Sequence, residues 1–409
     1  IREGTRRDVA RAMARKLVTE LSRERDEGLR ISTAAGLADA LWRTLGTELG
    51  YRVPDGSVPS PQDLALRLVE GTLGDLVEDS YQMTPSEASR VVAGLAGNAR
   101  TKEAYEWVCA EHGSVAFSFV PEDARSYDAL ANVQHVPQAD QWMLTNLARD
   151  VADGVIDAKT LEGIVARRIG APCAVAYEHH YATLVALVRL LGALTRYEAQ
   201  VPAATTMAEL MEGYAQGWHA VDRLYRELRL HYGHVAQGRF GMSLATTVNA
   251  MEARYDAFLS DCAARWQEHL LDEGPWPARG LPSQMDFFRD YVARKAPEPT
   301  RGHRIGVVVS DALRYECAVD LTERLNASKA RGLAGKSKAR VDARAGVVPS
   351  YTQLGMAALL PAGAMEIDPA TALVTKRGLS TAGTKARQAL IAGAIPGSMV
   401  CQADELPAN

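Results

Sequence analysis

The sequence predicts an α-helical N-terminal region followed by the beginning of an α/β domain. Three observations support this prediction. Apolar residues recur at helical spacing through roughly the first 270 residues, proline and glycine then cluster at 274–277 and 296–302, and an uninterrupted apolar run at 305–311 leads into a helical pattern. We expect a helical region at 1–200, a helical bridge and linker at 201–300, and an α/β domain at 301–409.

The helical region divides into several expected segments. At 5–49 one face is apolar, from Val9 to Leu21, and Gly50 supplies a stop. Thr84 and Pro85 have the pattern of an N-cap followed by the first helical residue. Further helices are expected at 138–168, 171–194, 207–232 and 244–271. One short strand is expected at 114–120, where apolar and small residues alternate.

The region after residue 300 is predicted to alternate between strands and helices. The run at 305–311 contains three consecutive valines and ends in Asp311, which is typical of a buried parallel strand. A helical pattern follows it, then a second strand is expected at 345–349 and a second helix at 352–360. Before the α/β domain, 284–295 predicts a short amphipathic helix.

The charge balance excludes a surface built mainly for nucleic acid. The chain has 46 Lys and Arg against 50 Asp and Glu, a net charge of −4. The local exception is a basic run between residues 329 and 344. We interpret it as a solvated connection, with a weak nucleic-acid contact through Lys336, Lys338 and Arg340 as the alternative, because the run has no interleaved aromatic residues.

The cysteine pattern favours a reducing, cytoplasmic location. The five cysteines are far apart and form no CxxC pair, which argues against a disulfide framework and a thiolate zinc site. The longest apolar runs are interrupted by arginine and are too short to span a bilayer, so no membrane contact is expected. The chain begins with Ile1 and lacks a signal-peptide pattern, and we read it as a piece of a longer protein.

Asp311 is the first candidate for chemistry. It stands where the first expected strand ends, and ligands of α/β sheets bind outside the carboxyl ends of the strands. A carboxylate at this position is placed to bind a metal, or alternatively to cap the following helix. Arg314 and Glu316 on that helix either reach the same crevice or form a solvated face.

The second candidate is the segment 347–361, VVPSYTQLGMAALLP. Ser350, Tyr351 and Thr352 precede a short apolar helix, whose N-terminus favours an anion such as phosphate. A threonine hydroxyl is a weak nucleophile and needs a base or a metal to activate it. Taken alone, Ser350 or Thr352 is more often a helix cap than a nucleophile.

VVVSDALRYE at 307–316 together with VVPSYTQLGMAALLP closely resembles the core of the PglZ family, type A-like. This is the family of phosphatase-like proteins of BREX bacteriophage-exclusion systems, within the alkaline phosphatase superfamily. Residues 282–289 and 378–387 also resemble it, and the likeness extends over roughly 207–406. The resemblance implies that 301–409 carries an incomplete alkaline-phosphatase-like core sheet.

The resemblance implies roles for individual residues. Asp311 corresponds to a metal ligand and Thr352 to the metal-bound nucleophile, with Ser350 as the competing nucleophile. Arg314, Glu316 and Gln353 are candidates for supporting the phosphate. The expected cofactor is a divalent metal, zinc first, with manganese or magnesium as alternatives.

The superfamily's remaining metal ligands are not matched in this sequence. No histidine follows Thr352, and the later acidic residues are Glu366, Asp368, Asp404 and Glu405. We therefore expect the remaining ligands to lie beyond residue 409 and this piece alone to be inactive.

The function implied by the resemblance is metal-dependent phosphoester hydrolysis in anti-phage defence. The expected partners are other BREX proteins and a phosphoester or nucleic-acid substrate. The alternative is a non-catalytic scaffold of the same complex. If Asp311 and Thr352 are merely caps in an unrelated doubly wound fold, they should lie more than about 8 Å apart, too far to share one ion. Glu178–His180 and His231–His234 are interpreted as structural.

Overall fold

The computed structural model describes residues 3–77, 83–273, 276, 281–294, 305–327, 338–361 and 363–405. The chain divides into two compact units. The first comprises Ile1–Gly192 and Leu224–Glu252, and the second comprises Ala193–Arg223 and Ala253–Asn409. The division falls within three helices: α10 (Glu178–Tyr197), α12 (His219–Val235) and α13 (Arg239–Glu273).

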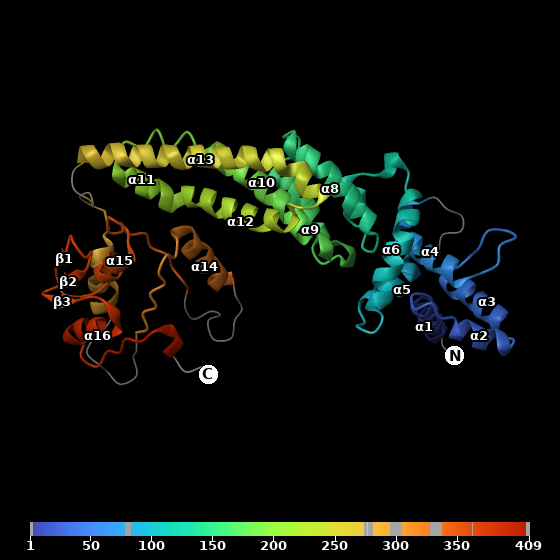
Figure 1. The fold of residues 1–409 in the computed structure, drawn as a ribbon. Helices are drawn as coiled ribbons and strands as arrows, with labels where there is room; N and C mark the ends of the chain where they lie inside the picture. Colours follow the sequence, from blue (N-terminus) through green and yellow to red (C-terminus); the bar gives the residue numbers. More distant parts are fainter. Residues whose placement is uncertain are drawn as a thin grey trace. The chain divides into compact units, whose positions relative to one another are not determined.

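The described part of the first unit is helical, as the apolar spacing predicts (Figure 1). Helix α4 packs against α5 and α6, α1 packs against α3, α4 and α5, and α6 packs against α8. Besides its parts of α10, α12 and α13, the unit contains these α-helices: α1 (Glu3–Leu21), α2 (Glu27–Ala34), α3 (Ala38–Leu49), α4 (Pro61–Gly71), α5 (Pro85–Ala96), α6 (Lys102–Ser118), α7 (Tyr127–Leu130), α8 (Pro137–Ala152) and α9 (Ala158–Arg168).

Local signals set several helix ends in the first unit. The Ser60 side chain accepts the N–H of Asp63 at the start of α4, and proline occupies the first helical position. Gly50 ends α3 in the left-handed region at φ 74°, where a Cβ atom is costly. Thr84 is the N-cap residue of α5, as expected, but its side chain makes no capping hydrogen bond.

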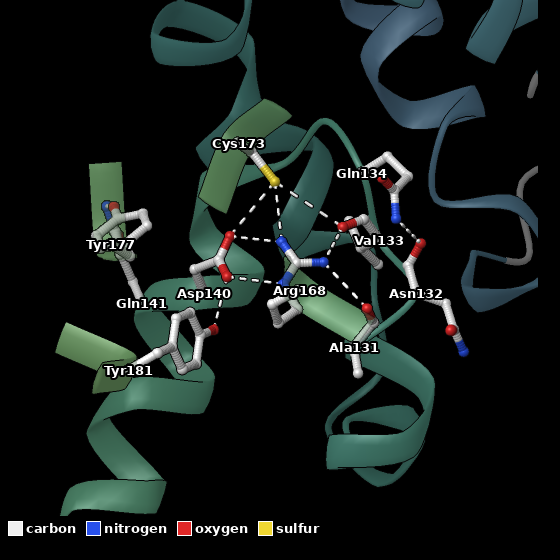
Figure 2. Close-up of polar contacts among 10 residues, drawn as sticks. All are labelled: Ala131, Asn132, Val133, Gln134, Asp140, Gln141, Arg168, Cys173, Tyr177 and Tyr181. Carbon is white, nitrogen blue, oxygen red and sulfur yellow. Dashed lines mark hydrogen bonds and ion pairs between the residues drawn. The ribbon is translucent and has the colours of Figure 1, made fainter. Parts of the chain in front are cut away.

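A buried ion pair joins three helices of the first unit (Figure 2). Asp140 on α8 and Arg168 on α9 form two hydrogen bonds of 2.9 and 2.7 Å, and both side chains are inaccessible to solvent. The Tyr181 hydroxyl on α10 donates to the same carboxylate at 2.6 Å. The guanidinium also donates to the carbonyls of Ala131 and Val133, so the pair holds the connection before α8 as well.

The strand expected at 114–120 is wrong. Helix α6 continues to Ser118, and Gly113, Ala116 and Phe117 are buried in it at helical spacing. The same apolar and small residues also form a buried face of a helix, and α6 packs against α4, α5 and α8.

The second unit combines helices with a small antiparallel sheet. Figure 1 shows the sheet beside α15 and α16, with β2 contacting α15 and β3 contacting α16. Leu354 and Ala357 of α15 pack with Val374 of β2 in a small core. Besides its parts of α10, α12 and α13, the unit contains these elements: α11 (Met207–Gly213), a π-helix (Tyr214–Trp218), α14 (Tyr315–Ala327), α15 (Thr352–Ala358), β1 (Met365–Ile367), β2 (Val374–Lys376), β3 (Leu379–Ser380) and α16 (Gly383–Ala394).

The expected parallel strands are not formed in the described residues. The segment 305–310 has no regular secondary structure, and its side chains are exposed, Val308 by 93%. At 345–349 there is only an isolated parallel bridge between Ser283 and Ala345. A parallel strand is stable only when it is paired and covered on both faces. The valine run has neither in the described part of the chain.

The observed sheet lies at 365–380, where no strand was predicted. Its order is β1-β2-β3, with Ile367 opposite Val374 and Lys376 opposite Leu379. Arg377 and Gly378 both have positive φ, 50° and 71°, as a two-residue hairpin of type I′ requires. Strands of two or three residues are too short to show a period in the sequence.

The segment expected to be an amphipathic helix at 284–295 differs in type. It forms a 3-10 turn at Gln284–Asp286 and a π-helix at Phe288–Ala293.

Among the described residues, no helix combines the length and the apolar character needed to cross a membrane.

Candidate functional site

Asp311 and Thr352 are in direct contact. The Thr352 hydroxyl donates to Asp311 Oδ2 at 3.0 Å, and Asp311 Oδ1 accepts the N–H of Ala312 at 3.1 Å. Both side chains are exposed. Neither is a helix cap, because α14 begins at Tyr315 and the N-cap residue of α15 is Tyr351. The wide separation expected of two unrelated caps is therefore not observed.

Gln284 holds the segment that carries Thr352. Its side-chain amide donates to the Gly355 carbonyl at 3.0 Å, and its side-chain oxygen accepts the N–H of Val347 at 3.2 Å. Its backbone N–H donates to Ala345 at 2.8 Å. One glutamine thus ties the approach to Thr352 and the first turn of α15 together. The resemblance at 282–289 includes Gln284 but does not indicate that it holds the Thr352 segment.

Arg314 and Glu316 are engaged with other groups. Arg314 forms an ion pair with Asp222 of α12 at 3.5 Å. Glu316 is fully buried in α14, and its carboxylate lies 3.0 Å from Cys317 Sγ. The role of these two residues in phosphate binding stays a prediction.

The remaining predicted residues lie on the surface. Ser350 and Gln353 flank the Tyr351–Thr352 step and are exposed. Lys338 and Arg340 are also exposed, and Lys336 lies outside the described residues.

A buried carboxylate was missed by the sequence reasoning. Asp222 is 4% exposed and accepts the hydroxyls of Tyr214 and, at 2.7 Å, Tyr255. Burial and then the hydrogen bond to Asp222 raise the pKa of both tyrosines, which keeps them protonated. Tyr214 and Asp222 lie on one continuous helical stretch, but Tyr255 and Arg314 come from two other segments, so no local pattern in the sequence connects all four.

Three histidines of the first unit also meet unexpectedly. His179 Nδ1 lies 3.0 Å from His231 Nδ1, and the His179 ring stacks on His234 with centroids 3.9 Å apart. The interpretation of these residues as structural stays a prediction. Within the described ranges, no group of three or more His, Cys, Asp or Glu side chains is arranged to hold a metal ion.

The Asp311–Thr352 pair suits part of a metal site. Two oxygens bound to one ion at about 2.1 Å are about 3.0 Å apart in octahedral geometry and about 3.4 Å apart in tetrahedral geometry. The observed 3.0 Å fits this donor spacing, and a carboxylate with a hydroxyl is an all-oxygen donor set. In such a site Asp311 and Thr352 would supply two ligands, and a complete set needs further groups.

Comparison with known families assigns a class to this part of the chain. Residues 287–408 match the model of the BREX system PglZ alkaline phosphatase-like domain, and both Asp311 and Thr352 lie inside the match. The region is thus alkaline phosphatase-like. Together with the relatives described next, this match shows that the chain is similar to BREX PglZ family proteins.

Two curated relatives resemble the chain over different lengths. The alkaline phosphatase-like protein BrxZ of Escherichia coli O9:H4 (strain HS) is 28% identical over 381 residues, 87% of this chain and 42% of the relative. The alkaline phosphatase-like protein PglZ of Bacillus cereus (strain H3081.97) is 27% identical over 224 residues, 54% of this chain and 25% of the relative. The chain therefore spans less than half the length of either relative. No solved structure matches it.

Proposed function

We propose that the protein is a metal-dependent phosphoester hydrolase acting in BREX-type anti-phage defence together with other BREX proteins. The observation that carries the proposal is the 3.0 Å hydrogen bond from Thr352 Oγ1 to Asp311 Oδ2. The match of 287–408 to a BREX alkaline phosphatase-like domain supports it, since both residues lie in that range.

In this mechanism Thr352 is the nucleophile and Asp311 orients it. The carboxylate accepts the hydroxyl hydrogen, which directs an oxygen lone pair outward to solvent, where a phosphoester approaches. A divalent cation, zinc first, bound by Asp311 and Thr352 would lower the pKa of the hydroxyl and neutralise charge on the phosphoryl oxygens. Gln284 keeps the Thr352 segment in place.

The direct test is hydrolysis of phosphomonoesters and phosphodiesters by the intact protein with zinc, manganese, magnesium or chelator. Thr352→Ala should lower kcat at least about a hundredfold because it removes the attacking oxygen, and Thr352→Ser should retain part of the activity. Asp311→Asn should lose activity with every metal, because it removes the carboxylate that is proposed to bind the cation.

Ser350→Ala is the matched control for this test. It removes a hydroxyl two residues away, also exposed, and should leave turnover near the wild-type value. Loss of activity in Ser350→Ala with full activity in Thr352→Ala would reassign the nucleophile to Ser350. Phage resistance that survives both Thr352→Ala and Asp311→Ala at normal protein levels would contradict hydrolysis and favour a non-catalytic scaffold.

A further inference from the structure

A cavity of about 360 Å³ opens in the second unit. This volume is within the usual range of small-molecule sites. The Trp266 and Trp276 rings meet edge to face with centroids 4.8 Å apart. The aromatic side chains that line the cavity are Tyr214, Trp218, Trp266, Trp276 and Tyr315.

Hydrogen bonds fix two of these rings. Trp276 Nε1 donates to the Gly346 carbonyl at 2.6 Å, and the Tyr315 hydroxyl donates to the Ala215 carbonyl at 3.3 Å. The polar atoms of both side chains are therefore already used within the protein. What they offer to a ligand is flat aromatic surface.

The charge of the lining disfavours a phosphate inside the cavity. Apart from the tyrosines, the ionisable side chains among the described lining residues are Cys262 and Arg344. Burial raises the pKa of the Cys262 thiol to about 11, so it is neutral at pH 7. The Arg344 guanidinium is paired with Asp290 at 3.0 Å. An uncharged flat ring is the ligand that this lining suits.

The cavity shares its chain segments with the Asp311–Thr352 pair. Tyr315 lies four residues after Asp311, and Gly346 lies six residues before Thr352. Four residues of chain span at most about 14 Å. This upper limit is compatible with a ligand that has a flat ring at one end and a phosphoester at the other.

We propose that the aromatic cavity binds the base of a nucleotide phosphoester whose phosphate is presented to Thr352. The proposal rests on the proposed hydrolase function and names its substrate class. Tryptophan and tyrosine faces bind purines and pyrimidines by stacking without requiring a particular sequence of bases.

The test is calorimetric titration of the intact protein with AMP, adenosine and ribose 5-phosphate in the presence of chelator, which keeps the esters unhydrolysed. AMP and adenosine should bind measurably, and ribose 5-phosphate, which lacks the base, should bind at least tenfold more weakly than AMP. Trp266→Leu should weaken adenosine binding about tenfold, which corresponds to about 1.4 kcal/mol.

Two further variants keep the test decisive. Trp266→Phe retains an aromatic ring and should bind adenosine within about threefold of wild type, so a loss in Trp266→Leu alone is a loss of stacking. Trp142→Leu removes a half-buried tryptophan of the first unit and should bind adenosine like wild type. Equal affinity for AMP and ribose 5-phosphate, or unchanged adenosine binding by a folded Trp266→Leu protein, would overturn the proposal.

The outcome separates the cavity from the hydrolase. If adenosine binds through Trp266 and no phosphoester is hydrolysed with any metal, the cavity binds bases but the proposed function fails. If ribose 5-phosphate is hydrolysed through Thr352 while Trp266→Leu leaves AMP binding unchanged, the hydrolase is supported and the base site is rejected.

Discussion

At the scale of single residues, the first unit contains the buried pair of Asp140 and Arg168 (Figure 2). Removing one member of a buried ion pair leaves an uncompensated charge, which typically costs about 3–5 kcal/mol. We predict that Asp140→Asn destabilises the protein by about that amount in urea unfolding. The same substitution should also make the Cys173 thiol, which lies 3.3 Å from the Asp140 carboxylate, accessible to alkylation.

The control for Asp140→Asn is Asp128→Asn. Asp128 also pairs with an arginine, Arg167, at 2.7 Å, but its side chain is 90% exposed. Exposed pairs contribute about 0–1 kcal/mol, so this change should leave stability nearly unaltered. Burial, and then the charge of Asp140, raise the pKa of the Cys173 thiol to about 12, so we expect this thiol to resist alkylation in the folded wild-type protein. Equal effects of the two substitutions would contradict this account.

The buried His135 leads to a second prediction, which concerns the pH dependence of stability. It is 4% exposed, and burial lowers the pKa of its ring to about 4 from an ordinary 6.5. The unfolded chain therefore binds the proton first as pH falls. The contribution of His135 to the free energy of unfolding is complete above about pH 6.5. It declines by about 1.4 kcal/mol per pH unit, roughly 3 kcal/mol in total, as the pH falls toward 4.

The measurement is urea unfolding between pH 4.5 and 7.5. His135→Phe should flatten the acid side of the stability curve, because no buried ring remains to be protonated. The same substitution at His234, which is exposed, should leave the slope unchanged. An identical slope in wild type and His135→Phe would show that other groups determine the acid sensitivity.

At the scale of elements, α15 depends on a residue that lies far from it in sequence. Gln284 bonds to Val347 and Gly355 through its side chain, so Gln284→Ala removes two hydrogen bonds at once. We predict faster amide hydrogen exchange in 345–355 in this variant. If Thr352 is the nucleophile, kcat should fall about tenfold because its segment is less well positioned.

Met285→Ala is the matched control for the Gln284 variant. Met285 is adjacent, and its side chain is 47% exposed. It should leave both hydrogen exchange and turnover close to wild type. Exchange in 345–355 that is the same in Gln284→Ala and wild type would show that packing of Leu354 against β2 is sufficient to hold α15.

At the scale of the whole molecule, metal binding should be visible as stability. A ligand that binds only the folded protein stabilises it by about 2.7 kcal/mol at a hundredfold excess over Kd. We predict that zinc raises the melting temperature of the intact protein and that chelator reverses the rise. Asp311→Asn should abolish the response, since it removes a carboxylate ligand.

Glu366→Gln provides the comparison for the metal test. Glu366 is an exposed carboxylate on β1 and should not alter the response to zinc. The same zinc-induced shift in Asp311→Asn and wild type would place the metal elsewhere. Because melting is recorded without substrate, this result does not depend on activity.

The sequence by itself determined most helices of the first unit but not the end of α6, because helical hydrogen bonds join neighbouring residues and leave a period along the chain. It also determined the two motifs that contain Asp311 and Thr352. The tertiary structure decided their 3.0 Å contact, the convergence on Asp222 and the pairing of Asp140 with Arg168. It also decided that 305–310 is not a strand. Strand pairing and buried polar contacts require partners distant in sequence, and no local pattern specifies which partners are present.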